Sequence, residues 1–129
     1  MKKYPFDQAA EKAGQLYGNL LGRVADKSGY DFVVSQLNTG ESSIKNIVIN
    51  MLTSDEFREK FVINNTPNEL AKLLHIVLLK ELRPRPEAIK NTAINLLEDD
   101  WRRVIINMIQ SEAYSKAFGE EKIPVIKYS

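Results

Sequence analysis

The chain carries one stretch twice: residues 44–61 read IKNIVINMLTSDEFREKF, and residues 101–118 read WRRVIINMIQSEAYSKAF. The two align without a gap at an offset of 57 positions (101 − 44 = 57). In both copies apolar residues recur every three or four positions, the spacing of one face of an α-helix. The identical pairs are Ile49 with Ile106, Asn50 with Asn107, Met51 with Met108, Ser54 with Ser111, and Phe61 with Phe118. The pattern predicts a duplicated helical unit whose two copies bury each other's apolar faces.

The same register continues upstream, where Leu16 falls on Leu73, Leu21 on Leu78 and Arg23 on Lys80. The strict alternation typical of β-strands is missing from the chain. We therefore expect an all-α fold: a single globular domain over residues 1–129 with seven or eight short helices. Its internal repeat covers about residues 7–61 and 66–118, and residues 119–129 form an extended C-terminal tail.

Capping residues predict where the helices of the first copy begin and end. We expect Asp7 to cap a first helix that reaches Leu21 and stops at Gly22. Ser28 is expected to cap the second helix, and Gly40 to close it in a left-handed conformation.

The boundaries between the copies and in the second copy follow the same rules. Thr53 and Glu56 have the spacing of a capping box, and Thr66, Pro67 and Glu69 satisfy three helix-start rules at once. Arg83 to Pro86 should end that helix, with helix resuming near Glu87. The remaining expected boundaries are Asp99 and Asp100 before a helix starting at Trp101, Ser111 as the cap of the last helix, and Gly119 as its end.

Composition excludes several classes of function. The chain of 129 residues has 18 basic and 17 acidic side chains, one His and no Cys. Disulfides, thiolate metal sites, a Cys nucleophile, a thioether-linked cofactor and a multi-histidine metal site are therefore ruled out. The net charge of +1 is far from that of a dedicated nucleic-acid binder. No apolar stretch approaches the roughly 18 residues of a spanning helix, and no secretory signal is visible, so we expect an intracellular protein.

The sequence contains few residue arrangements that are typical of a catalytic site. His75 lies among leucines and is expected to be a helix-surface or hydrogen-bonded core histidine. Adjacent pairs such as Asp99 with Asp100 point in different directions and do not make facing carboxylates. We therefore expect no enzymatic activity, no metal site and no bound cofactor.

Two features suggest contact with a partner. The segments Arg83-Pro84-Arg85-Pro86 and Trp101-Arg102-Arg103 bring together four arginines and the only Trp. Arg and Trp are favoured anchors at protein interfaces, although a solvated loop with Trp101 in the core would explain them equally well. The tail, Glu121 to Tyr128, has three possible placements: along its own domain, against a partner, or frayed.

The first half resembles a bacterial repeat module of unknown function that occurs in many surface and secreted proteins. The resemblance is carried by Leu16-Tyr17-x-x-Leu20-Leu21-Gly22-Arg23-x-x-Asp26-x-x-Gly29, then Leu37-x-x-Gly40, then Ser54-Asp55-Glu56-Phe57-Arg58. This similarity implies a general interaction or structural module, in a surface or phage assembly, without any link to pigments.

The second half is similar to the end of the phycobilisome linker domain through Ser111-Glu112-Ala113-Tyr114, then Phe118-Gly119-Glu120-x-x-Ile123-Pro124. This resemblance implies a non-enzymatic assembly protein that inserts into phycobiliprotein trimers or hexamers, of phycocyanin or allophycocyanin. It further implies contact with the bilins of those subunits without a covalent bond, tuning of energy transfer, and a cytoplasmic location peripheral to the thylakoid membrane. The expected contact residues are Arg23, Arg58, Arg83, Arg85, Trp101, Arg102, Tyr114, Phe118 and Tyr128.

Overall fold

The backbone follows the helical periodicity of the sequence. The computed structural model describes residues 2–128 and contains no strand among them; the first and last residues of the predicted domain lie outside this range. The helices are α1 (Phe6–Leu16), α2 (Lys27–Thr39), α3 (Ile44–Leu52), α4 (Asp55–Phe57), α5 (Pro67–Leu79), α6 (Pro86–Glu98), α7 (Trp101–Ile109) and α8 (Glu112–Phe118). Two π-helical turns, Tyr17–Leu21 and Arg58–Val62, continue α1 and α4. The prediction of an all-α fold with seven or eight short helices is confirmed.

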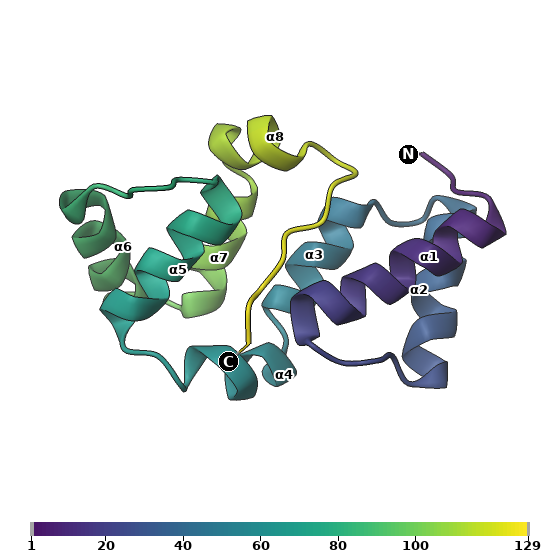
Figure 1. Cartoon of the computed structure of the whole chain (residues 1–129), viewed down its shortest axis with the longest axis horizontal. Helices are drawn as coiled ribbons and strands as arrows, with labels where there is room; N and C mark the ends of the chain where they lie inside the picture. The colour runs from purple at the N-terminus through teal and green to yellow at the C-terminus, as the bar shows by residue number, and fades with distance from the viewer. Residues whose placement is uncertain (1, 129) are drawn as a thin grey trace.

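The helices form two groups on either side of the C-terminal segment, with α1, α2 and α3 on one side and α5, α6 and α7 on the other (Figure 1). Their bounds follow the sequence offset: α3 begins at Ile44 and α7 at Trp101, and they end at Leu52 and Ile109 (109 − 52 = 57). We call residues 6–62 the first unit and residues 67–118 the second unit.

Helices α3 and α7 join the two units and run in opposite directions. At the start of α7, the Arg102 Nε donates to the carbonyl of Thr53, at the end of α3, over 2.9 Å. At the start of α3, the Lys45 ammonium lies 5.9 Å from the centre of the Tyr114 ring, which follows α7. Each unit therefore places a basic residue at the far end of the other unit's central helix.

One cluster of buried side chains extends through both units. Aromatic and branched residues fill it, and burial of each such side chain stabilises the fold by about 1.5–3 kcal/mol. The largest side chains that are fully buried are Tyr114, Phe57, Leu16, Leu20, Leu37, Ile44, Leu52, Leu74, Leu78, Ile105, Ile109 and Val48. The units thus share one core, as expected for copies that cannot bury their apolar faces alone.

Several predicted caps are present. Thr66 and Glu69 form a reciprocal capping box at the start of α5, with Pro67 as its first residue. The Asp100 carboxylate accepts from the backbone N–H of Arg102, and the Ser111 hydroxyl oxygen accepts from that of Tyr114.

The predicted helix ends in the first unit are also present. Gly22 and Gly40 adopt left-handed conformations, with φ of 64° and 78°. Gly119, directly after the second unit, also has a positive φ, of 60°.

Three predicted caps are wrong by one or two positions. Asp7 lies inside the first turn of α1, because the extended residue Pro5 precedes the helix. Asp26, not Ser28, caps α2: its carboxylate accepts from the Gly29 N–H, and Ser28 donates its hydroxyl to the same side chain. Ser54, not Thr53, caps α4 by accepting from the Phe57 N–H.

Helix α5 ends earlier than the proline-rich segment suggests. Lys80 adopts a left-handed conformation with φ of 56°, and both Lys80 and Glu81 direct their backbone N–H groups to the carbonyl of His75. Pro86 begins the next helix instead of ending the previous one. The α5 end is thus set by a non-glycine residue in a conformation that L-residues rarely adopt.

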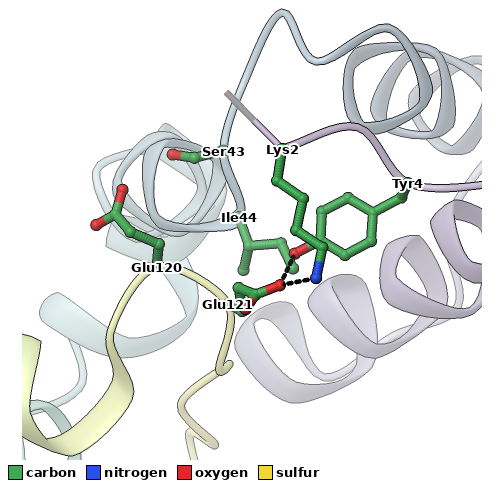
Figure 2. A pocket seen from close by; sticks show the side chains of 6 residues that line it. All are labelled: Lys2, Tyr4, Ser43, Ile44, Glu120 and Glu121. Carbon is green, nitrogen blue, oxygen red and sulfur yellow. Dashed lines mark hydrogen bonds and ion pairs between the residues drawn. The ribbon is translucent and has the colours of Figure 1, made fainter.

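Of the placements considered for the tail, the structure shows the first: it lies along its own domain. It runs between the two groups of helices from α8 towards α4 (Figure 1). At its start, Glu121 accepts a hydrogen bond from the Tyr4 hydroxyl over 3.0 Å and pairs with Lys2 (Figure 2). Farther along, Pro124 and Ile126 are buried.

The tail meets the π-helical turn that ends α1. The last carbonyls of a helix have no partner within it. Here the Asn19 carbonyl accepts from the Ile126 N–H over 2.8 Å, and the Leu20 carbonyl accepts from the Tyr128 hydroxyl over 2.6 Å. The Leu21 carbonyl accepts from the Lys60 ammonium over 2.8 Å. Three donors from other segments therefore complete this helix end.

Two constraints favour glycine at position 22: the positive φ of its backbone and the close approach of the tail. A Cβ at this position would lie 2.8 Å from Cδ2 of Tyr128, and the positive φ strains any L-residue by about 1–2 kcal/mol. Gly22→Ala is therefore expected to lower the free energy of unfolding by about 1–3 kcal/mol, measured by urea denaturation. Gly14→Ala, where a Cβ meets nothing within 4 Å, is the control and should raise it by about 0.5–1 kcal/mol. Equal effects of the two substitutions would contradict this account.

Tyr114 differs from its counterpart Phe57 by one hydroxyl group (114 − 57 = 57). Its ring packs against Phe118, with 4.8 Å between ring centres, as Phe57 packs against Phe61 at 5.1 Å. The Tyr114 hydroxyl is buried without a hydrogen-bond partner among the described residues. Burial raises the pKa of this hydroxyl above its ordinary value.

A buried hydroxyl without a partner costs about 1–3 kcal/mol. Tyr114→Phe is therefore expected to leave the free energy of unfolding unchanged or to raise it, measured by urea denaturation. The reciprocal change Phe57→Tyr introduces the same group in the first unit and should lower the free energy by about 1–3 kcal/mol. A loss of that size in Tyr114→Phe would show that the hydroxyl has a partner.

Candidate interaction surface

The loop between α5 and α6, residues 80–85, exposes an apolar side chain beside two arginines. Leu82 is 92% exposed, and Arg83 and Arg85 are exposed as well. Within residues 2–128, neither arginine makes an ion pair or a hydrogen bond. Pro84 and Pro86 restrict the backbone around both arginines, because the proline ring fixes φ and limits the preceding residue. The 80–85 loop therefore presents two guanidiniums and a leucine on a restrained backbone.

A buried histidine fixes this loop to both neighbouring helices. The Nδ1 of His75, on α5, lies 2.7 Å from a carboxylate oxygen of Glu81, in the loop. The Nε2 lies 2.8 Å from the hydroxyl oxygen of Thr92, on α6. Of the two placements left open by the sequence, His75 is thus the hydrogen-bonded core residue, and it is 7% exposed.

The arrangement of carboxylate, imidazole and hydroxyl at Glu81, His75 and Thr92 is a structural link. Both imidazole nitrogens are engaged and the ring is buried, so the three side chains join the loop to α5 and α6 from inside the fold. Among residues 2–128, no three His, Asp or Glu side chains are grouped to hold a metal ion.

Helix α6 is the least buried of the long helices. Only Ala93 is fully buried on it, whereas Leu97 is 71% exposed and Ile94 is partly exposed. The sequence did not identify Leu82 and Leu97 as surface residues, because periodicity assigns leucines to the core. The signal that Leu82 did carry is its position directly before Arg83 and the proline-rich segment.

Three arginines predicted to contact a partner are engaged inside the molecule. The Arg23 guanidinium pairs with Glu56, with 2.7 and 2.9 Å between donor and acceptor atoms. Arg102 donates to the Thr53 carbonyl and pairs with Asp55. Arg58 remains about half exposed and pairs with its neighbour Glu59. Arg23 and Arg102 therefore contribute first to the fold.

The predicted aromatic contacts need correction. Tyr114 is fully buried and Phe118 is 6% exposed, so a partner that docks on the closed fold cannot reach them. Their spacing in a short helix directs both into the core beside α5. Trp101 is partly buried against the core beneath the Arg102 guanidinium, and Tyr128 is partly buried against Phe61 and Gly22. Of the nine predicted contacts, Arg83 and Arg85 are the two that lie exposed and unpaired among the described residues.

An ion cluster holds α4 against the end of the first helix. Glu56 receives the Arg23 guanidinium and the Lys60 ammonium, at 2.7 and 2.8 Å. Hydrogen bonding from Arg23, together with the charge of Lys60, lowers the pKa of Glu56 to about 2. The same pairing raises the pKa of Arg23. Lys60 also donates to the Leu21 carbonyl, so the cluster is joined to the π-helical turn.

Stability should therefore depend on the charge of Glu56. Its pKa is lower in the folded chain than the usual 4.5, so its contribution is complete above about pH 4.5 and is lost as the pH falls towards 2. Glu56→Gln is expected to lower the thermal midpoint near neutral pH, and the difference from the native chain should shrink towards pH 2. Glu59→Gln, at the exposed pair with Arg58, is the control and should change little. A difference independent of pH would contradict the assignment.

Comparison with known proteins identifies one family model. Residues 7–61 match the family described as "Domain of unknown function (DUF4214)". The match spans the first unit, including the residues that carry its resemblance to a repeat module, and its description refers to no pigment protein. No curated protein matches the chain. No helix within the described residues has both the length and the apolar character needed to cross a membrane. The first unit is thus similar to a domain family whose function is unknown.

Proposed function

We propose that the chain is a non-enzymatic assembly module that binds another protein through the 80–85 loop. The observation that carries this proposal is the exposure of Leu82 beside Arg83 and Arg85. An apolar side chain flanked by guanidiniums combines contact area with directed polar contacts, which is typical of residues that anchor interfaces. Leu97, on the adjoining helix α6, adds a second exposed apolar side chain.

The rigidity of the loop supports the same proposal. His75 holds Glu81 from inside, and two prolines restrict the backbone around the arginines. A loop that is already ordered loses little conformational entropy on binding, so more of the contact energy contributes to affinity. The complementary partner surface carries carboxylates that can pair with Arg83 and Arg85, beside an apolar patch for Leu82.

The narrower proposal is a linker of phycobiliprotein rings. It is supported by the similarity of residues 111–124 to the end of the phycobilisome linker domain. On this proposal the chain inserts into trimers or hexamers of phycocyanin or allophycocyanin, joins discs and tunes the bilins by contact. It would then act in the cytoplasm, at the surface of the thylakoid membrane.

Most of the residues that carry this similarity serve the fold. Ser111 caps α8, Tyr114 fills the core, Gly119 has a positive φ, and Pro124 is buried. The similarity thus supports a shared helix-and-tail arrangement more directly than a shared partner. The alternative proposal is a general repeat-type interaction module of a surface or phage assembly, favoured by the match of the first unit to a domain of unknown function.

Co-sedimentation with purified phycocyanin and allophycocyanin distinguishes the two proposals. A linker is expected to form larger assemblies at low micromolar concentration and to shift the bilin emission maximum. Reversal of both loop charges, Arg83→Glu with Arg85→Glu, should then weaken binding by about tenfold or more, because two charge-assisted contacts become repulsive.

The matched control reverses Lys27 and Lys116 to Glu, which changes the net charge equally at two exposed helix positions outside residues 80–85. It should leave binding unchanged. If neither biliprotein binds, the linker proposal fails. If binding occurs but the loop reversal does no more than the control, docking through the 80–85 loop is wrong.

A further inference from the structure

Three lysines from separate segments line one open pocket between the units. Lys12 comes from α1, Lys80 from the end of α5 and Lys122 from the tail, and the pocket volume is about 490 Å³. The side chains of Gln15 and Asn19 line the same pocket. We call these five residues the lysine pocket. Its volume lies within the range of pockets that hold small ligands.

In the first unit, carboxylates neutralise the basic residue that corresponds to Lys80. Lys80 corresponds to Arg23 in the repeat (80 − 57 = 23), and Arg23 is paired with Glu56 and Asp26. At the same offset, Glu56 is replaced by Ala113 and Asp26 by Arg83. Both carboxylates that balance the basic residue in the first unit are therefore missing from the second.

The same replacement opens space. Lys60, which fills the ion cluster of the first unit, corresponds to Ala117, and Ala117 lines the lysine pocket (117 − 57 = 60). Two of the three cluster positions, those of Arg23 and Lys60, thus correspond to residues that line the pocket, Lys80 and Ala117. The positive charge has been kept there while the internal anion has been lost.

Within the described residues, none of Lys12, Lys80 and Lys122 makes an ion pair. Lys80 lies with its ammonium 5.2 Å from the centre of the Phe118 ring, which also lines the pocket. Lys80 is also the non-glycine residue with a positive φ, a strained conformation that is often retained for a function.

One carboxylate, that of Glu121, borders the pocket but is already engaged. Figure 2 shows its side chain turned towards Lys2 and Tyr4. Hydrogen bonds from these two side chains, with Lys2 the stronger cause, lower the pKa of Glu121. The charge of Lys12 also lowers the pKa of Glu121, so this one carboxylate is shared between Lys2 and the three lysines of the pocket, which lack a full counter-charge.

We infer that the lysine pocket binds a small multivalent oxyanion, a phosphate or a polycarboxylate, which supplies Lys80 with the negative charge that Glu56 supplies to Arg23 in the first unit. The ammonium groups supply charge, and the amides of Gln15 and Asn19 supply donors for the remaining oxygens. The pocket shares Lys80 with the 80–85 loop, but none of its lining residues is Leu82, Arg83 or Arg85, so anion binding does not depend on protein docking through those side chains.

Isothermal titration of the purified chain with pyrophosphate and with citrate tests the inference, with chloride as the monovalent reference. We expect one site with a dissociation constant below about 1 mM for at least one of the two anions, weakening as salt is added. The tighter anion identifies the source as phosphate or carboxylate. Absence of saturable binding by both anions up to about 10 mM would overturn the inference.

Variants locate the site. Lys80→Asn removes the charge but keeps a residue that tolerates a positive φ, and it should weaken binding by about tenfold or more, as should Lys12→Gln and Lys122→Gln. Lys72→Gln, on an exposed face of α5 outside the pocket, is the matched control and should have no effect.

The sharpest variant restores the carboxylate of the first unit. Ala113 is exposed, so Ala113→Glu should fold normally, pair with Lys80 and abolish anion binding. Circular dichroism checks that each variant is folded. If Lys80→Asn and Ala113→Glu both bind as the native chain does, or if Lys72→Gln weakens binding equally, the anion site is not the lysine pocket.

Discussion

The carbonyl groups at the end of the π-helical turn depend on donors from outside their helix. Asn19, Leu20 and Leu21 have no following turn to satisfy them, and leaving such groups buried and unpaired would cost more than most single contacts contribute. The tail supplies two donors, and Lys60 supplies the third. This requirement determines the path of the tail between the units, the glycine beneath Tyr128 and the placement of the Glu56 ion cluster.

The two units use the same helices for different electrostatic purposes. In the first unit, Arg23 and Lys60 share the carboxylate of Glu56, and these ion pairs hold α4 to the end of α1. In the second unit, alanines stand at the positions of Glu56 and Lys60, and Lys80 keeps its charge near the surface. The shared hydrophobic core tolerates this divergence, because none of the exchanged side chains is among its buried residues and Ala117 only packs against them. The first unit thus keeps its ion cluster while the corresponding charges of the second unit differ.

The sequence predicted what depends on periodicity and missed what depends on tertiary neighbours. Helices appear where apolar spacing and paired start signals agree, as at Thr66, Pro67 and Glu69. Caps were misplaced where two suitable side chains lie within two positions of each other. Asp26 caps α2 in place of Ser28, and Ser54 caps α4 in place of Thr53. Sequence spacing alone does not show which of the two side chains reaches the free backbone N–H. The π-helical turn was missed as well, since its donors come from distant segments. From the sequence, exposed and buried residues are equally good candidates for contact with a partner. The structure shows that Tyr114 and Phe118 are buried, whereas Arg83 and Arg85 are exposed.

The path of the tail also sets an order of events during synthesis. Tyr128 follows Leu20 by 108 residues, so the first helix leaves the ribosome long before its capping donors exist. At translation rates of about 5–20 residues per second, that interval is roughly 5–20 s. The first unit must spend this time with the carbonyls of Asn19 and Leu20 hydrated, whereas the donor for Leu21, Lys60, is made earlier. Completion of the amino-terminal half is therefore among the last steps of folding, although that half is made first.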